Sequence, residues 1–172
     1  MNRGLTDPDD LQPAPCGATM RHLLIVSHSP SPNTGALTDA VVRGARHEDV
    51  TAVDVRSLPP LQAGTDDVLW AHAVILGTTE NFGYMSGALK DFFERIYYPC
   101  LEKTQGMPYA LFVKGGNDGT GAKTSVERVI AGLRWRAVQD PIVMRGAFKE
   151  EWLGPCEELG MAMAVGLEAG IF

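Results

Sequence analysis

Short apolar runs alternate with amphipathic segments along most of the chain. Runs rich in Leu, Ile and Val, such as residues 21–27 (RHLLIVS), have the length of strands that are buried on both faces of a sheet. These runs predict strands at residues 21–27, 50–55, 73–77 and 109–113. A fifth strand is expected between Ala137 and Met144, where Pro141 would be tolerated mainly at a sheet edge.

Apolar residues at helical spacing separate the predicted strands. The clearest repeat places five apolar side chains on one face, namely Leu89, Phe92, Phe93, Ile96 and Tyr97, and Pro99 is expected to end that helix. Helices are predicted at about residues 37–45, 65–71, 89–97, 126–133 and 154–170. This alternation predicts an α/β fold in which helices cover both faces of a five-stranded parallel sheet. Ligands of such sheets bind outside the carboxyl ends of the strands.

The composition fits one globular domain of 172 residues, with 45 % hydrophobic and 21 % charged residues. Residues 1–19, rich in Asp and Pro, are predicted to be a flexible N-terminal tail, and residues 20–172 to be the folded domain. No apolar stretch reaches the roughly 20 residues that a membrane-spanning helix needs. The net charge of −6, without any Lys/Arg cluster, argues against a nucleic-acid partner.

The cysteines and histidines indicate neither a disulfide framework nor a metal site. Cys16, Cys100 and Cys156 are odd in number and widely spaced, so a reducing, cytoplasmic location is expected. The four histidines do not occur at metal-ligand spacing with each other or with cysteine.

The loop after the first predicted strand is rich in hydroxyl groups and leads directly into a helix. Ser29, Ser31, Asn33 and Thr34 bring polar side chains to the positive end of that helix, which favours a bound anion. Because the loop contains no Lys or Arg, neutral donors would hold a monophosphate, whereas a triphosphate with Mg²⁺ normally needs a Lys. The alternative is a Ser/Pro connector whose Asn33 or Thr34 only caps the helix.

The loop after the third predicted strand places two aromatic residues beside two glycines. It runs from Thr78 to Gly87 (TTENFGYMSG). A planar ligand would fit along Phe82, with backbone amides of residues 81–83 at its polar edge. The alternative is a turn whose aromatic side chains cap the core.

The loop after the fourth predicted strand contains four glycines between Gly115 and Gly121. It looks superficially like a Walker A phosphate loop, but Ala122 separates Gly121 from Lys123, so a nucleotide triphosphatase is disfavoured. The glycines would let the backbone approach the same ligand as the other two loops. A flexible connector is the alternative.

Together these three segments resemble the flavodoxin-like family, in particular the NAD(P)H-dependent FMN reductases and flavodoxin-family oxidoreductases. The most specific motif, FGxMSGxLK, lies within residues 77–90 (GTTENFGYMSGALK), and the resemblance spans residues 20–172. It implies a three-layer doubly wound flavodoxin-like fold with strand order 2-1-3-4-5. It also implies FMN-binding residues in all three loops: Ser29, Ser31, Asn33 and Thr34 at the phosphate, Thr78, Thr79, Glu80, Asn81, Phe82 and Gly83 at the isoalloxazine ring, and Gly115, Gly116, Asn117 and Asp118 on the third side.

The resemblance implies an oxidoreductase whose cofactor carries the reaction, so no catalytic side chain is assigned. NADPH or NADH would reduce FMN, and the electrons would pass to a small acceptor such as a quinone. The alternatives are a flavodoxin-type FMN electron carrier that acts on partner proteins and a flavin-free binding domain. Relatives are often homodimers, and the sequence leaves the oligomeric state, the acceptor and the choice between NADH and NADPH open.

Overall fold

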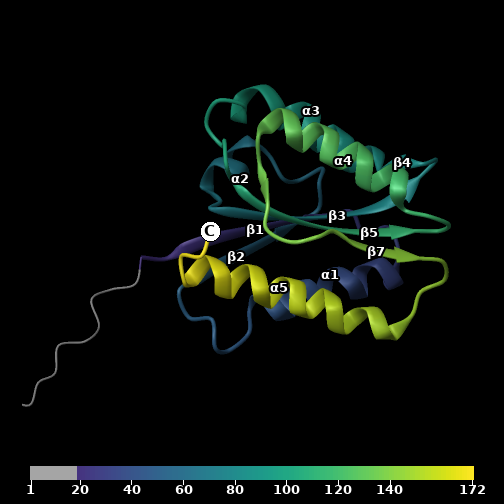
Figure 1. The fold of residues 1–172 in the computed structure, drawn as a ribbon, viewed down its shortest axis with the longest axis horizontal. Helices are drawn as coiled ribbons and strands as arrows, with labels where there is room; N and C mark the ends of the chain where they lie inside the picture. Colours follow the sequence, from purple (N-terminus) through teal and green to yellow (C-terminus); the bar gives the residue numbers. More distant parts are fainter. Residues whose placement is uncertain (1–18) are drawn as a thin grey trace, which may run out of the picture.

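The computed structural model describes residues 19–172, whose seven-stranded sheet lies between two helical layers (Figure 1). Four parallel strands form its centre in the order β2-β1-β3-β5: β2 (Val53–Leu58), β1 (Arg21–Ser27), β3 (Ala73–Asn81) and β5 (Pro108–Gly115). The short strands β6 (Arg136–Ala137) and β7 (Ile142–Arg145) both pair in parallel with β5, and β4 (Tyr84–Met85) pairs antiparallel with β3. The predicted order 2-1-3-4-5 is therefore confirmed, with β6 and β7 together in the place of the fifth strand.

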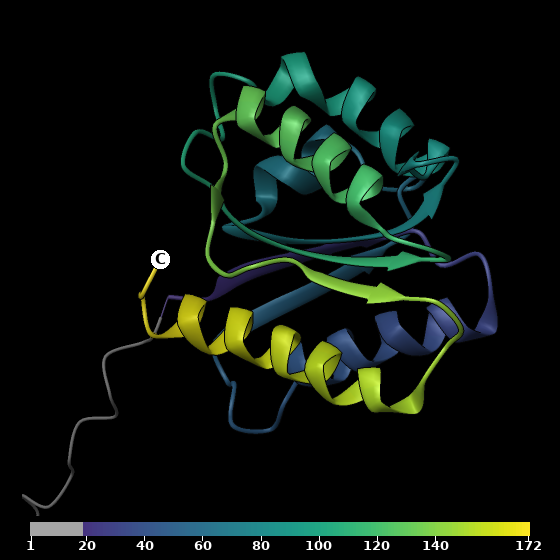
Figure 2. The ribbon, with the colours of Figure 1, turned by 45° about the vertical axis from the view of Figure 1, so that its right-hand side comes forward.

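Helices cover both faces of the sheet (Figure 2). One layer contains α1 (Pro32–Ala45) and α5 (Leu153–Glu168), which follows the 3-10 turn η1 (Glu150–Trp152); the other contains α2 (Thr65–Trp70), α3 (Gly87–Cys100) and α4 (Thr120–Leu133). Side chains of β1 alternate between the layers: Leu24 and Val26 belong to the core beneath α2, α3 and α4, whereas Leu23 and Ile25 belong to the core beneath α1 and α5. This double burial explains the continuous apolar run in β1.

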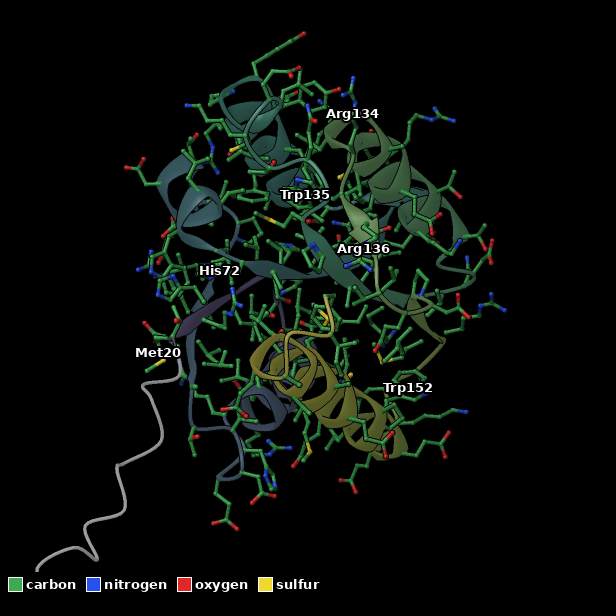
Figure 3. The ribbon with its side chains drawn as sticks, turned by 60° about the vertical axis from the view of Figure 1, so that its left-hand side comes forward. Met20, His72, Arg134, Trp135, Arg136 and Trp152 are labelled. Carbon is green, nitrogen blue, oxygen red and sulfur yellow. The ribbon has the colours of Figure 1, made fainter. Side chains whose placement is uncertain are left out.

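The two edges of the sheet have different roles. Met20 and His72, which precede β1 and β3, mark the amino edge (Figure 3). The carboxyl ends of the strands lie at the opposite edge, on the right in Figure 1, and the loops that the sequence singles out all begin there. Within residues 19–172, every helix is too short or too polar to cross a bilayer.

The structure corrects several predicted boundaries. The fifth strand is divided into β6 and β7, with Pro141 in the gap, because proline cannot donate a ladder hydrogen bond. The second strand begins three residues later than expected, at Val53. Helix α3 continues past Pro99 to Cys100, since a proline in the last turn costs only one N–H bond. Strand β4 is an element that the sequence pattern missed. The predicted tail lies outside the described residues apart from Thr19.

Candidate functional site

The carboxyl ends of four parallel strands, β1, β3, β5 and β7, meet at a cavity of about 290 Å³ at this edge of the sheet. Six of the predicted cofactor residues line it: Ser31, Asn33, Thr34, Thr79, Glu80 and Gly116. The cavity is also lined by Pro30, Lys114, Gly146, Ala147 and Phe148. Segments that are far apart in the sequence therefore share one polar recess, as expected for the carboxyl edge of a doubly wound sheet.

The first loop ends in a capping box at the start of α1. Ser31 is the N-cap residue; its Oγ accepts the Thr34 N–H at 3.3 Å, and Thr34 Oγ1 accepts the Ser31 N–H at 3.0 Å. The Ser29 hydroxyl lies in a second cluster, 2.7 Å from the Thr38 hydroxyl, which is also 2.8 Å from the Ser27 hydroxyl. Asn33 is exposed at the first turn. The loop thus presents hydroxyl and amide groups at the positive end of α1.

The second loop is a β-hairpin between β3 and β4. Asn81 pairs with Tyr84, and both residues between them have positive φ, 54° at Phe82 and 70° at Gly83, as in a type I′ turn. The Phe82 side chain is fully exposed at the tip, so it does not cap the core. Thr78 is buried, where its hydroxyl donates to the Thr79 carbonyl and accepts the Ser86 N–H. Thr78 therefore holds the base of the hairpin.

The third loop is tied to that hairpin through Glu80. The Glu80 carboxylate accepts the N–H of Gly119 at 3.0 Å and the N–H of Ala122 at 3.1 Å, both at the start of α4. Close approach reinforces this link, because a Cβ on Gly121 would lie 2.0 Å from the Gly83 carbonyl oxygen. The negative charge of Glu80 thus lies at the positive end of the α4 dipole, and its hydrogen bonds join the second and third loops.

The remaining residues of the third loop form its turn. Gly115 is buried, and a Cβ there would lie 2.6 Å from the Gly119 nitrogen, so this close approach requires glycine. Asn117 and Asp118 are exposed, and the Asp118 carbonyl accepts Arg145 Nε–H at 2.8 Å. Their location at the rim, outside the cavity lining, leaves their contact with a cofactor a prediction.

A fourth loop, which sequence reasoning missed, completes the cavity. Gly146, Ala147 and Phe148 follow β7 and line the same cavity as the first loop. The Gly146 N–H donates to the Gly115 carbonyl at 3.0 Å, and the Gly146 carbonyl accepts Lys114 Nζ at 2.5 Å. The predicted fifth strand could have indicated this loop. A fifth parallel strand ends at the same edge of the sheet as the others, so the loop after it is also a candidate for ligand binding.

Two charged side chains line the cavity, Lys114 and Glu80. Since Glu80 is bonded to the start of α4, the cavity does not present a free carboxylate to an anion. His28 follows β1 at the same edge, and partial burial lowers its pKa, which favours the neutral imidazole. The hydrogen-bond donors of the cavity are hydroxyl groups, an amide and one ammonium group, and this set fits a phosphate monoester. The backbone of the β3–β4 hairpin lies next to these donors.

Comparisons with known proteins agree with this architecture. A model of the NADPH-dependent FMN reductase family matches residues 20–150. A flavodoxin from Aquifex aeolicus is 25 % identical over 114 residues, which are 66 % of this chain and 60 % of that flavodoxin, so the match spans less than two thirds of that protein.

Solved structures share the fold at low sequence identity. A flavodoxin from the domain Archaea has a TM-score of 0.73 at 20 % identity, over 86 % of this chain and 99 % of that one. An NADH:FMN oxidoreductase in its apo form has a TM-score of 0.66 at 15 % identity, over 86 % of this chain and 90 % of that one. A flavodiiron protein from Giardia intestinalis has a TM-score of 0.71 at 17 % identity, over 89 % of this chain and 38 % of that one. With a flavodoxin-like fold and a family match over residues 20–150, the chain belongs to the NADPH-dependent FMN reductase family.

Proposed function

We propose that this protein binds FMN at the carboxyl edge and uses it to pass electrons from NADPH or NADH to a small acceptor such as a quinone. The convergence of the end of β3 and of the loops after β1, β5 and β7 on one polar cavity is the observation that carries the proposal. Family membership supports FMN as the cofactor. When bound, FMN supplies the redox chemistry, by accepting a hydride and releasing electrons to the acceptor.

The protein's own part is to position and shield the cofactor. Ser31, Asn33 and Thr34 would hold the phosphate at the start of α1, where hydrogen bonds to a charged group contribute about 1.5 to 3 kcal/mol each. Thr79 and the hairpin tip would flank the ring, with backbone amides beside its polar edge. No acid or base is needed from the chain for hydride transfer, so we assign no catalytic side chain.

The second candidate is an electron carrier that binds FMN and reacts only with partner proteins. Its support is the similarity to flavodoxins, one in sequence and others in structure. The two candidates share the cofactor site and differ in whether the flavin accepts electrons from a free nicotinamide nucleotide. A cytoplasmic location and a homodimer stay predictions for either.

An absorption experiment separates the candidates. The purified protein is loaded with FMN at micromolar concentration, made anaerobic and mixed with NADPH or NADH. Rapid bleaching of the bound flavin supports the reductase, and bound flavin that ignores both nucleotides supports the carrier. A protein that takes up no FMN would overturn both.

A further inference from the structure

The first loop is poor in backbone donors for an anion. Pro30 and Pro32 have no N–H, and they occupy two positions of the turn that enters α1. The N–H groups of Ser31 and Thr34 already donate within the capping box, and the Gly35 N–H donates to the Ser31 carbonyl at 2.8 Å. The backbone of this loop therefore offers few free N–H groups to a doubly charged phosphate, so a charged donor from elsewhere would add to the loop's side-chain donors.

Lys114, at the end of β5, contributes the positively charged side chain to the cavity lining. Its Nζ donates to the carbonyl oxygens of Gly146 at 2.5 Å and Gly115 at 3.1 Å, and lies 5.7 Å from the centre of the Trp152 ring. The labelled Trp152 in Figure 3 lies at the start of α5. These contacts fix the ammonium group and leave one of its three N–H bonds for a ligand.

Within the part of the chain that the structure describes, the charge of Lys114 has no acidic partner. Among the ion pairs of residues 19–172, none involves Lys114, and its two hydrogen-bond acceptors are neutral carbonyls. Glu80 lines the same cavity, but its carboxylate is bonded to two N–H groups of the β5–α4 region. A fixed, uncompensated cation that lines the same cavity as hydroxyl groups favours the binding of a phosphate.

We propose that Lys114 provides the positive charge that binds the FMN phosphate, in place of the N–H donors that Pro30 and Pro32 remove. This inference rests on the proposed FMN site and assigns to it a residue from outside the first loop. Because Lys114 also holds the Gly146 carbonyl, phosphate binding and the position of the fourth loop depend on the same side chain. Lys114 is thus a binding residue that selects the phosphorylated form of the flavin.

The test compares FMN with riboflavin, which has the same ring and lacks the phosphate. Dissociation constants for both are measured by flavin fluorescence quenching with wild type, Lys114→Met and Lys114→Gln. Methionine keeps a long apolar stem near Trp152, and glutamine keeps a donor for the Gly146 carbonyl without the charge. Both variants are expected to weaken FMN binding at least about tenfold and to change riboflavin binding less than about twofold.

Lys149→Met is the matched control. Lys149 Nζ lies 6.0 Å from the same Trp152 ring, but Lys149 is exposed and does not line the cavity. Its removal is expected to leave both dissociation constants unchanged. Added salt should weaken FMN binding by wild type more than by Lys114→Gln, since screening acts on the charge that the variant lacks.

Three outcomes would overturn the assignment. Unchanged FMN affinity in both Lys114 variants would exclude a role for the charge, and an equal loss for FMN and riboflavin would place Lys114 at the ring or at the fourth loop. If Lys114→Met fails to fold, Lys114→Gln alone decides between these results. A wild type that binds neither flavin removes the proposed function itself, and this inference with it.

Discussion

The two helical layers hold their loops at the site in different ways. On one face, α1 and α5 touch backbone to backbone: a Cβ on Gly44 would lie 1.8 Å from the Glu157 carbonyl oxygen, and a Cβ on Gly160 would lie 1.9 Å from the Val41 carbonyl oxygen. Figure 2 shows these two helices side by side beneath the sheet. The first loop, at the start of α1, is therefore positioned by close packing of the helix behind it.

On the other face, α3 and α4 leave an open groove of about 510 Å³. Aromatic rings and the aliphatic parts of longer side chains form most of its lining. The lining residues are Tyr84, Lys90, Phe93, Glu94, Tyr97, Tyr98, Arg128 and Val129. Here the second and third loops are held by separate hydrogen bonds, chiefly those of Glu80 and the bond from Met85 N–H to Ser125 Oγ at 3.0 Å.

The comparison shows that the larger of the two cavities is not the one that best fits the proposed cofactor. The groove between α3 and α4 is larger than the cavity at the carboxyl edge, yet it lacks the converging hydroxyl and backbone donors. It also follows that one half of the proposed cofactor site rests on packing and the other on a few polar contacts. Substitutions should therefore destabilise the two faces by different mechanisms, through steric clashes on the packed face and through lost hydrogen bonds on the open face.

The largest expected effect comes from Gly160→Ala in α5. The new methyl group would collide with the backbone of α1 at Val41, which cannot turn away as a side chain can. Overpacking of this kind costs about 3 kcal/mol, well above the roughly 1 kcal/mol that alanine gains over glycine in a helix. Urea denaturation would measure the loss in the free energy of unfolding.

Gly132→Ala in α4 is the matched substitution on the open face. Its methyl group would meet the Tyr97 hydroxyl at 2.2 Å, but this is the tip of a partly exposed side chain that can swing aside. We expect a change within about 0.5 kcal/mol, or a small gain in stability. Equal losses in the two variants would contradict the distinction between the faces.

The next effect concerns the loop that the packed face supports. Ser31→Asp keeps an N-cap acceptor and adds a negative charge that the start of α1 favours, so folding stability should be retained. FMN binding should weaken about 100-fold, because two like charges about 5 Å apart repel by about 3 kcal/mol at an effective dielectric constant of about 20. Parallel titrations with FMN and riboflavin would show the loss for FMN alone.

Gly64→Asp provides the control for this charge. It places a new carboxylate at the N-cap of α2, outside the cavity lining, and its φ of −145° accepts any residue. FMN affinity should stay at the wild-type level. If Ser31→Asp also binds FMN normally, the phosphate does not lie at the first loop.

Much of this architecture follows from local sequence, and the rest depends on contacts between distant segments. The apolar run at residues 21–27 predicts β1 because both of its faces are buried, and the same logic places three loops at one edge. The fourth loop was missed because β6 and β7 are short, are separated by Pro141 and owe their place to pairing with β5. The bond from Glu80 to residues about 40 positions later has no local signal.

A smaller effect is expected from Glu80→Gln on the open face. The amide oxygen can still accept one N–H at the start of α4, but the NH₂ group would face the other, so the link between hairpin and third loop weakens. We expect a loss of about 1 to 2 kcal/mol in the free energy of unfolding. Hydrogen exchange should show faster exchange at Gly119 and Ala122.

Glu127→Gln in α4 is its control. Glu127 pairs with Lys123 one turn away on the same helix, and such i,i+4 pairs contribute no more than about 0.5 kcal/mol. If Glu80→Gln loses no more stability than Glu127→Gln, the close approach of Gly121 and Gly83, and not the Glu80 carboxylate, joins the second and third loops.

The smallest effect concerns Glu168, at the far end of the packed face. Its carboxylate accepts N–H groups of Ala52 at 2.6 Å and Thr51 at 2.8 Å, and these bonds lower its pKa. A carboxyl whose pKa is lower in the folded state than its unfolded value of about 4.3 stabilises the protein above that pH, and the contribution is lost as pH falls through the folded pKa. Unfolding free energies measured from neutral pH down through this window should therefore decline less steeply in Glu168→Gln than in wild type. Identical slopes in the two proteins would mean that the Glu168 carboxyl has the same pKa in the folded and the unfolded chain, so that its bonds to the Thr51–Ala52 segment add no stability.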